Sequence, residues 1–483
     1  MMENDKLMIK AIENKIKKIW SEELNVDVDV QDNYFLLGGN SLMAITIIGR
    51  IQKIFDDKIN VPFHFIFSYP TVMKLSKAIY SLLKDKDYEG QENILNLLRR
   101  DIKLDIIPNN DKKIIQNNKC LLTGATGYLG AYLLRELLEE TEMEIYCLVR
   151  AASPKEAINK LQNVLKKCNC FIYDEKRVHV VLGDLGIKKM GIKEKEYDEL
   201  AEKIDCIYHN GAKVHFLYGY NELKNVNVDG TKEIIKFASY KRRKALFYIS
   251  TISIFSRFRS DNKLVMENED ISDPGILPIG YTQSKWVAEG LIWKAKEMGI
   301  PVIVYRLGHI VGDSITGICN TGDFIFRIIE TCLLLQFYPD IEGEIAPIAV
   351  DDVAKIVVKV SQKTKEYGTA YHVINPQSIS FQKAIEIAKR MGVNLWPVNI
   401  NEWIKRVKSC EANLPITPFI DFFDKKYWNQ NKKLEFSTEN LSRALKKIQF
   451  AIHPMDPELI NKYYTYIKKQ QHIKGLYESG TIE

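Results

Sequence analysis

The sequence lacks the features that mark an exported, membrane-bound or metal-binding protein. The segment from Met1 to Lys10 is polar and has no apolar signal core, and no apolar run is long enough to span a bilayer. The eight cysteines show no zinc-like pairing, since the closest two, Cys168 and Cys170, have one residue between them. Reduced thiols therefore fit better than a disulfide framework, and we expect a cytoplasmic protein with no metal site and no membrane partner.

An excess of charge of one sign is also missing. The formal net charge is only +6 over 483 residues, and the basic residues do not form a cluster. A nucleic-acid-binding protein would be expected to carry a clustered basic face, so we expect no nucleic-acid partner. The hydrophobic content of 46% and the charged content of 27% are those of an ordinary globular protein, and the length predicts two or three domains.

The N-terminal part of the chain predicts an all-α helical bundle. Isoleucines and a tryptophan recur at helical spacing over residues 6–24, and a loop over residues 26–40 leads to a second helix that begins at Ser41. A proline then precedes a last apolar stripe, for which Thr71 is a suitable N-cap. We assign residues 1–85 to a four-helix bundle, which is large enough to fold alone.

A linker and a different pattern follow the bundle. Residues 84–90 are charged and end in glycine, so we expect an exposed linker, which we place at residues 86–105. From Lys119 onward, short β-rich runs alternate with helical stretches, which predicts an α/β, Rossmann-like fold with a doubly wound parallel sheet. The expected strands are residues 119–123, 144–149, 178–182, 206–209, 246–250 and 302–305.

We expect two parts within residues 106–483. Residues 106–305 carry the alternation of strands and helices and are assigned to the Rossmann-like subdomain. After about residue 305 the order of elements is less regular, and several prolines interrupt the chain. Residues 306–483 are therefore expected to form mainly a smaller C-terminal subdomain that binds substrate.

Three glycines follow the first expected strand and precede a helix. Gly124 permits a tight turn, Gly127 lets the backbone approach a pyrophosphate, and Gly130 lets the helix pack on the strand. The start of the helix would then face the phosphates with free N–H groups and a partial positive charge. An ordinary turn between a strand and a helix is the alternative, but the strand, the spacing and the helix together favour a dinucleotide.

The choice between the two dinucleotides is expected at the end of the second strand. A carboxylate at that point would hold the ribose 2′-hydroxyl of NAD, but the sequence there is Leu148-Val149-Arg150. Arginine matches a 2′-phosphate by its charge and its fork geometry, so NADPH is favoured. A solvated surface arginine is the alternative interpretation of Arg150.

A tyrosine and a lysine lie four residues apart, at Tyr281 and Lys285, and therefore on one face of a helix. A phenol with a pKa near 10 is a poor acid or base at neutral pH unless a neighbouring cation stabilises its anion. Such a pair arises often by chance, but here it follows a strand that ends in hydroxyl residues, among them Thr251. A hydroxyl at that strand end can hydrogen-bond a substrate oxygen beside the phenol.

Residues 119–310 resemble the extended short-chain dehydrogenase/reductase family, and more narrowly the thioester reductase domains that end nonribosomal peptide synthetases and carboxylic acid reductases. The resemblance runs from about Asp101 almost to the end of the chain and is loose beyond residue 360. Leu307 stands where the family often has proline, which should affect a loop and not the chemistry. Besides the glycine loop, the matching segments are residues 147–151, 183–185, 209–212, 227–231, 250–251, 281–285 and 305–308.

The resemblance implies a role for each matching residue. Tyr281 would be the proton donor, Lys285 would lower its pKa and hold the nicotinamide ribose, and Thr251 would orient the carbonyl. Lys213 and His215 lie near the cofactor segment, but we interpret them as a variable wall of the cleft. The cofactor-binding residues would be Thr123, Gly124, Thr126, Gly127, Tyr128, Leu129, Gly130, Arg150, Asp184, Leu185, Asn210, Gly211, Ala212, Tyr281 and Lys285.

The segment 32–42 resembles the phosphopantetheine attachment site of acyl and peptidyl carrier proteins. Ser41 would carry 4′-phosphopantetheine, and the helix that begins there can stabilise the phosphodiester through its free N–H groups. A plain N-cap role is the alternative, because serine is preferred at that position anyway. Asn40 stands where the family usually has aspartate. This difference could alter recognition by the phosphopantetheinyl transferase that attaches the arm, but it leaves the nucleophilic hydroxyl of Ser41 unchanged.

Together the two resemblances imply an NADPH-dependent reductase that releases a carrier-bound acyl or peptidyl thioester as an aldehyde, with further reduction to an alcohol left open. A phosphopantetheinyl transferase would modify the carrier, and upstream adenylation or condensation modules, or a separate synthetase, would load it. A tethered substrate has a high effective concentration, so no tight pocket for a soluble substrate is required. We expect the chain to be a monomer.

Three other functions remain open. A nucleotide-sugar epimerase or dehydratase shares the fold and the Tyr–Lys pair, but it would normally favour NAD and has no use for a carrier. A non-redox release domain that cyclises its substrate resembles this chain but typically lacks the tyrosine at position 281. A carrier and docking protein with an inactive reductase-like half is disfavoured by the intact glycine loop and by Thr251, Tyr281 and Lys285.

Overall fold

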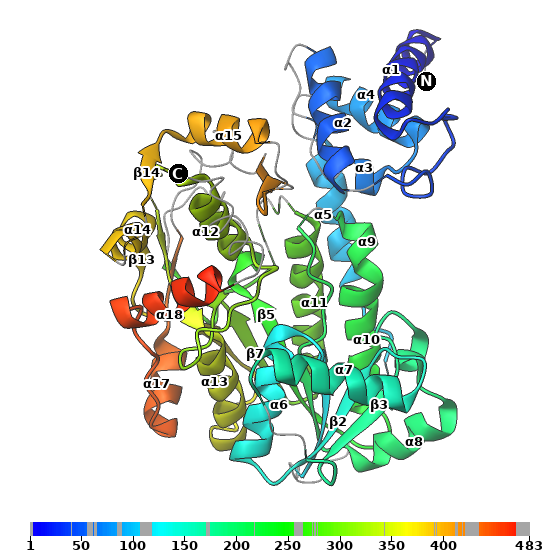
Figure 1. The fold of residues 1–483 in the computed structure, drawn as a ribbon. Coiled ribbons are helices and arrows are strands. Elements are labelled where there is room, and N and C mark those ends of the chain that lie inside the picture. Colours follow the sequence, from blue (N-terminus) through cyan, green and yellow to red (C-terminus); the bar gives the residue numbers. More distant parts are fainter. Residues whose placement is uncertain are drawn as a thin grey trace.

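The computed structural model of the chain describes residues 3–39, 41–55, 61, 65–84, 89–106, 118–170, 174–216, 218–255, 264–272, 274, 277, 279–341, 343–390, 392, 394–410, 414–417, 419–420 and 434–469. A small helical bundle stands at one end of a larger α/β part (Figure 1). Every helix in these ranges is too short or too polar to cross a lipid bilayer.

The bundle confirms the all-α class expected for the first part of the chain. Its core is aliphatic, with Trp20 and Tyr34 fully buried and their rings 5.1 Å apart. The expected cap is present, because the hydroxyl of Thr71 accepts a hydrogen bond of 3.2 Å from the backbone N–H of Lys74. The four helices are α1 (Glu3–Leu24), α2 (Ser41–Ile54), α3 (Phe65–Ser68) and α4 (Val72–Lys84).

The region expected to be a linker contains a helix, α5 (Glu89–Asp101), that packs on the reductase-like part (Figure 1). Leu98 is fully buried in the same core as helix α11 (Gly280–Glu297), and Gly290 of α11 lies under the side chain of Ile102 with no room for a Cβ. The expectation of an exposed linker at residues 86–105 was therefore wrong for this helix. Its charged residues obscured an apolar face.

The six expected strands all form and pair in parallel, as a doubly wound fold requires. The order of the sheet is β12-β7-β5-β4-β1-β2-β3, in which the direction of winding reverses beside β1. The strands are β1 (Lys119–Thr123), β2 (Glu144–Val149), β3 (Val178–Leu182), β4 (Cys206–His209), β5 (Ala245–Thr251), β7 (Val302–Leu307) and β12 (Thr369–Val373).

Helices cover both faces of this sheet. Alternate residues of a strand point to opposite faces, so Cys120 and Leu122 of β1 enter one core while Leu121 enters the other. The first face is covered by α6 (Tyr128–Glu140), α7 (Pro154–Lys167), α13 (Val350–Lys363) and α17 (Glu439–Ile448). The second is covered by α5, α8 (Glu194–Lys203), α9 (Tyr220–Lys224), α10 (Gly230–Ser239) and α11.

The C-terminal region contributes both to the sheet and to a separate layer. The strand β12 and the helices α13 and α17 belong to the Rossmann-like part, so the expected division at residue 305 is too early for them. The sequence signal for β12 is weak, because His372 interrupts its short apolar run.

A third core holds the separate layer together and contains the fully buried Trp403. This layer is built from α12 (Phe324–Leu335), α14 (Phe381–Arg390), α15 (Ile400–Ser409), α18 (Pro457–Lys468) and the pair β9 (Phe337–Pro339) and β14 (Trp396–Val398). Smaller pairs join β8 (His309–Val311) to β11 (Pro347–Ala349), β10 (Glu344–Ile345) to β13 (Ile379–Ser380), and β6 (Leu264–Val265) to β15 (Glu435–Phe436).

The packing of α5 predicts the effect of truncating its buried face. Leu98→Ala removes a fully buried side chain from the core shared with α11, so the free energy of unfolding of the α/β part should fall by about 2–4 kcal/mol. Urea denaturation followed by tryptophan fluorescence measures the loss. Arg99→Ala is the matched control, because the adjacent Arg99 is exposed and its loss should change stability by no more than about 0.5 kcal/mol. Equal effects of both variants would contradict the assignment of α5 to this core.

Candidate active site

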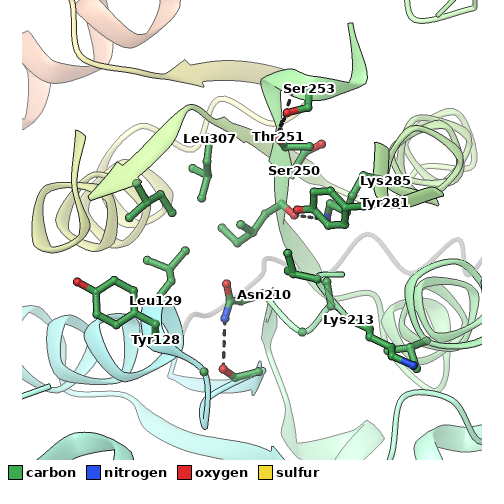
Figure 2. A pocket seen from close by; sticks show the side chains of 18 of the residues that line it. Tyr128, Leu129, Asn210, Lys213, Ser250, Thr251, Ser253, Tyr281, Lys285 and Leu307 are labelled. Carbon is green, nitrogen blue, oxygen red and sulfur yellow. Dashed lines mark hydrogen bonds between the residues drawn. The ribbon is translucent and has the colours of Figure 1, made fainter. Parts of the chain in front are cut away.

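A pocket of about 1200 Å³ lies at the carboxyl ends of the central strands (Figure 2). In a parallel doubly wound sheet this edge is where ligands bind, beside the point at which the winding reverses. The pocket is lined by most of the residues singled out from the sequence, which are Gly124, Thr126, Gly127, Tyr128, Leu129, Arg150, Asp184, Leu185, Asn210, Gly211, Ala212, Thr251, Tyr281 and Lys285.

The glycine turn after β1 fits a dinucleotide by its shape. Gly124 adopts a positive φ of 73°, and a Cβ on it would lie 2.8 Å from the Cα of Gly211. A Cβ on Gly130 would overlap the carbonyl oxygen of Gly124, so the start of α6 packs directly on the turn. Gly127 is the N-cap of α6 and supplies no side chain to bind the first N–H groups of the helix. Those groups can therefore bind a phosphate.

Two expected cofactor residues lie behind this turn instead of in the pocket. Thr123 is fully buried, and its hydroxyl accepts a hydrogen bond of 2.8 Å from the N–H of Gly211 and lies 2.9 Å from Nδ1 of His209. Gly130 is buried and is likewise not among the lining residues. Both support the turn, and Asn210 adds a third link by donating its amide to the carbonyl of Gly124 at 3.3 Å.

Two cations lie at one end of the pocket, Arg150 directly after β2 and Lys160 on α7. The side chain of Arg150 is 82% exposed, and its guanidinium lies 3.6 Å from the carboxylate of Asp184. The ammonium of Lys160 lies beside it and donates to the backbone carbonyl of Arg150 at 2.8 Å. Lys160 was not singled out from the sequence, although its position in the second turn of the helix after β2 was a usable signal.

The Tyr–Lys pair lies in the wall of the pocket, where Lys285 is buried and Tyr281 is partly buried (Figure 2). The Lys285 ammonium donates a hydrogen bond of 2.6 Å to the carbonyl of Ile249 and lies 4.3 Å from the ring centroid of Tyr248. Burial lowers the pKa of Lys285 to about 7, against the opposing effect of the carboxylate of Glu289. Burial also raises the pKa of Tyr281 to about 12, so the phenol is protonated at neutral pH.

The hydroxyl expected to orient a carbonyl stands at the end of β5. Thr251 lines the pocket, donates to the hydroxyl of Ser253 at 3.1 Å and accepts from the N–H of Ser253 at 3.2 Å. Ser253 also lines the pocket and was not singled out from the sequence. The hydroxyls of Thr251 and Ser253 are thus hydrogen-bonded to each other at the pocket surface. Rotation of either hydroxyl would let it donate a hydrogen bond to a substrate oxygen.

A π-helical turn, residues Asn225–Asp229, connects the segment around Lys213 to α11, the helix that carries Tyr281, by hydrogen bonds. The amide of Asn227 donates to the carbonyl of Lys213 at 3.0 Å and to the hydroxyl of Ser284 at 2.9 Å, and its oxygen accepts from the N–H of Lys213 at 2.7 Å. Turns of this kind often occur at functional sites. Asn227 belongs to a segment that the family resemblance matched, but the sequence alone gave it no role.

Aromatic side chains from distant segments form the wall opposite the nucleotide end. The ring of Phe216 lies 6.0 Å from that of Tyr281, 6.4 Å from Phe324 and 6.4 Å from Phe419. Phe419 also packs against the core of the helical bundle. None of these phenylalanines was predicted, because nothing in their local sequences distinguishes them from core residues.

The segment around Lys213 lies between the pocket and the bundle. Lys213 lines the pocket and places its ammonium 4.5 Å from the ring centroid of Tyr218, while His215 stacks on the same ring at 3.7 Å. Tyr218 in turn packs against the core of the bundle. Lys213 thus forms part of the pocket wall, whereas His215 is not among the residues that line the pocket.

Ser41 is the first residue of α2, as the sequence predicts. Gly38, just before it, has a positive φ of 88°, and a Cβ on Gly39 would overlap the ring of Tyr34. The glycines are therefore needed for the turn into the helix. Asn40 lies outside the described residues.

Two family models match the chain. A model described as a phosphopantetheine attachment site matches residues 14–79, and one described as male sterility protein, an NAD-binding family, matches residues 122–357. The first match covers the helical bundle and includes Ser41. The second covers the glycine turn, the Tyr–Lys pair and most of the parallel sheet, so it indicates a nicotinamide cofactor.

Curated relatives contain the whole of this arrangement within longer chains. A linear gramicidin synthase of Brevibacillus parabrevis is 32% identical over 94% of this chain, which spans 9% of that protein. L-2-aminoadipate reductase of Schizosaccharomyces pombe is 28% identical over 85% of this chain, which spans 31% of it. The chain thus corresponds to less than a third of the length of these two relatives.

Solved structures match the reductase part alone or both parts together. The terminal R domain from the myxalamid PKS–NRPS biosynthetic pathway is 31% identical, with a TM-score of 0.73, over 79% of this chain and 99% of that one. A thiolation–reductase di-domain from an archaeal nonribosomal peptide synthetase matches 96% of this chain and 98% of its own in fold, with a TM-score of 0.69 at 23% identity. The chain belongs to the family of terminal reductase domains of nonribosomal peptide synthetases, joined here to a carrier domain.

Proposed function

We propose that this chain releases an acyl or peptidyl group from its own carrier domain by reducing the thioester to an aldehyde with NADPH. The observation that carries the proposal is the convergence of Thr251, Tyr281 and Lys285 on the pocket that also holds the glycine turn. We place the carrier at residues 1–85 and the reductase at residues 106–483, and we assign α5 to the reductase because of its packing.

The cofactor end of the pocket suits NADPH. When bound, this cofactor supplies the hydride for the reduction. We propose that the N–H groups at the start of α6 bind the pyrophosphate, that Asp184 and Leu185 line the adenine, and that Arg150 and Lys160 bind the 2′-phosphate. Arg150 would exchange its ion pair with Asp184 for the phosphate, a change that its exposed position permits.

The residues around the reacting carbon move protons and stabilise charge. We propose that Tyr281, protonated at neutral pH, donates its proton to the carbonyl oxygen as the hydride reaches the carbon, while Thr251 holds that oxygen by a hydrogen bond. The product of this step is a hemithioacetal. Its hydroxyl then loses a proton as the carbon–sulfur bond breaks, which gives the aldehyde and returns the thiol of the arm. Lys285 would hold the nicotinamide ribose and support the phenolate that Tyr281 becomes.

The carrier end explains how the substrate arrives. We propose that Ser41 carries 4′-phosphopantetheine, attached by a phosphopantetheinyl transferase, and that upstream synthetase modules load the arm. Tyr218 and Phe419 contact the bundle core, and the phenylalanines beside Tyr281 continue from them into the pocket. An arm that reaches from Ser41 into the pocket raises the effective concentration of the substrate, so tight binding of a soluble substrate is not needed.

Two alternatives are disfavoured by particular residues. A cyclising release domain needs no hydride, and an intact set of Tyr281, Lys285 and Thr251 would have no purpose in it. A nucleotide-sugar epimerase needs no carrier domain and normally uses NAD, whereas this pocket has two cations at the ribose end. A second reduction, of the aldehyde to an alcohol, would use the same residues. Identifying the released product as an aldehyde or an alcohol shows whether this second step takes place.

Release should depend on Ser41 and on the phenol of Tyr281. A phosphopantetheinyl transferase transfers acyl-phosphopantetheine arms from a panel of acyl-coenzyme A thioesters to Ser41 of the apo-protein. NADPH is then added, and mass spectrometry identifies the released product. Tyr281→Phe should slow release by about 100-fold or more because the proton donor is lost, and Ser41→Ala should not accept the arm at all. Release that continues without NADPH, or at an undiminished rate in Tyr281→Phe, would contradict the reductive mechanism.

The preference for NADPH over NADH should depend on the two cations at the nucleotide end of the pocket, Arg150 and Lys160. Arg150→Ala should raise the KM for NADPH by about 10-fold to 100-fold and leave the KM for NADH nearly unchanged, because only NADPH carries the 2′-phosphate. Lys160→Ala should have a smaller effect of the same kind. Lys155→Ala, at an exposed position of the same helix outside the pocket lining, is the control and should change neither value. An equal loss of affinity for both cofactors in Arg150→Ala would show that Arg150 does not read the phosphate.

A further inference from the structure

A buried ion pair lies directly behind the catalytic face of the pocket. Arg306, on β7, and Glu289, on α11, have side chains that are 1% and 0% exposed. The Nε of Arg306 lies 2.9 Å and its Nη2 2.8 Å from Oε1 of Glu289. Burying two charges is costly and is compensated only when further hydrogen bonds satisfy both groups, so the partners of the pair are informative.

Glu289 contacts the elements that carry two of the proposed catalytic residues. It follows Lys285 by one turn on the same face of α11. Its second carboxylate oxygen accepts a hydrogen bond from the hydroxyl of Ser250, which immediately precedes Thr251 at the end of β5. Its first oxygen also accepts from the indole N–H of Trp293 at 3.0 Å. Glu289 therefore joins the helix of Lys285 to the strand end of Thr251.

Arg306 connects the carboxylate to the C-terminal region. Its Nη1 donates to the carbonyl of Glu267 at 3.0 Å and lies 3.2 Å from Nε2 of His372 on β12. The carboxylate of Glu267 accepts the backbone N–H groups of His372 at 2.9 Å and of Leu441, in the first turn of α17, at 3.2 Å. The position of Glu289 is thus fixed by β7, which carries Arg306, and through Arg306 and Glu267 by β12 and α17.

The charge on Lys285 depends on few neighbours. Glu289 is the carboxylate that acts on it among the residues that the structure describes, and it opposes the effect of burial. Burial lowers the pKa of His209, on β4, to about 3, so that imidazole is neutral. The other titratable groups beside Lys285 are the phenols of Tyr248 and Tyr281, which are protonated at neutral pH, while Arg306 is paired with Glu289.

We propose that Glu289 is a positioning residue of the reductase, which holds the end of β5 through Ser250 and keeps Lys285 in its charged form, and that Arg306 fixes the carboxylate in place. The inference rests on the proposed function, because it assigns a task within the same site. A purely structural ion pair would stabilise the fold and leave the protonation of Lys285 unchanged. The two cases differ in the pH dependence of NADPH binding and of reduction.

The test is Glu289→Gln in the full chain, which keeps the size of the side chain and removes its charge. The dissociation constant of NADPH, measured by its fluorescence, and the rate of thioester reduction are recorded from pH 5.5 to pH 9.5. NADPH binding and the reduction rate should both fall as the pH rises through the pKa of Lys285, because the ammonium loses its proton and its charge. Without the carboxylate, the pKa of Lys285 falls. The alkaline limb, which is the part of each pH profile where binding or rate decreases at high pH, should therefore move to lower pH by about one unit. The kcat at neutral pH should fall by about 10-fold.

Two further variants keep the test decisive if Glu289→Gln folds poorly. Glu289→Asp retains a carboxylate at a shorter reach and should give a limb between those of the wild type and Glu289→Gln. Ser250→Ala leaves the ion pair intact and removes the link to β5, so it should lower kcat without moving the alkaline limb. A limb that stays in place in both Glu289 variants, or an unchanged kcat in Ser250→Ala, would overturn the assignment.

Glu136→Gln is the matched control. Glu136 is 1% exposed and paired with Arg135 at 3.2 Å, but it lies on α6 outside the residues that line the pocket. Its loss should lower the thermal unfolding temperature and leave the pH profiles unchanged.

NADPH binding is measured without any thioester, so a failure of the proposed reduction would appear as bound cofactor with no product. A failure of the present inference would appear as an unshifted limb.

Discussion

The parallel pairing of β1, β4, β5 and β7 is the constraint on which the rest of the site depends. Because these strands run in one direction, their carboxyl ends meet at a single edge, where the turn after β1 lies beside the end of β4 and β4 lies beside β5. A Cβ on Gly124 would lie 2.8 Å from the Cα of Gly211, so the turn after β1 packs directly against the segment after β4. The nucleotide end and the reacting end of the pocket therefore both lie along one edge of the sheet.

Burial has opposite consequences for the two members of the Tyr–Lys pair. It raises the pKa of Tyr281, which keeps the phenol as a proton donor, and it lowers the pKa of Lys285, which removes the charge that the phenolate would need. The carboxylate of Glu289, which is not among the residues that line the pocket, opposes the lowering of the pKa of Lys285. The network from Glu289 through Arg306 to Glu267 is, in this view, the reason that β7, β12 and the start of α17 are required close to the site.

The carrier and the C-terminal layer meet at the aromatic wall. Tyr218 and Phe419 contact the core of the bundle, and Phe216 lies between them and Tyr281. The helix α5 then holds the bundle to the reductase by burying Leu98, while the hydroxyl of Tyr220 donates to the carboxylate of Asp101 at 2.6 Å. These contacts place the bundle beside α5 and α9, at one end of the reductase part (Figure 1).

Local patterns in the sequence determined the class of each part of the chain, the six predicted strands, the glycine turn and the Tyr281–Lys285 spacing. They did so because periodicity, capping and turn chemistry act over a few residues. The helix α5 and the strand β12 were missed, since charged residues mask the apolar face of one and His372 interrupts the other.

Only the tertiary structure decided which groups surround the reacting centre. Phe216, Phe324 and Phe419 come from segments up to about two hundred residues apart, and each looks like an ordinary core residue on its own. Glu289 and Arg306 acquire their importance only when β7 lies against α11 and both charges leave water together. Desolvation and long-range contacts are properties of the folded chain, which explains why the motifs were visible in the sequence and their support was not.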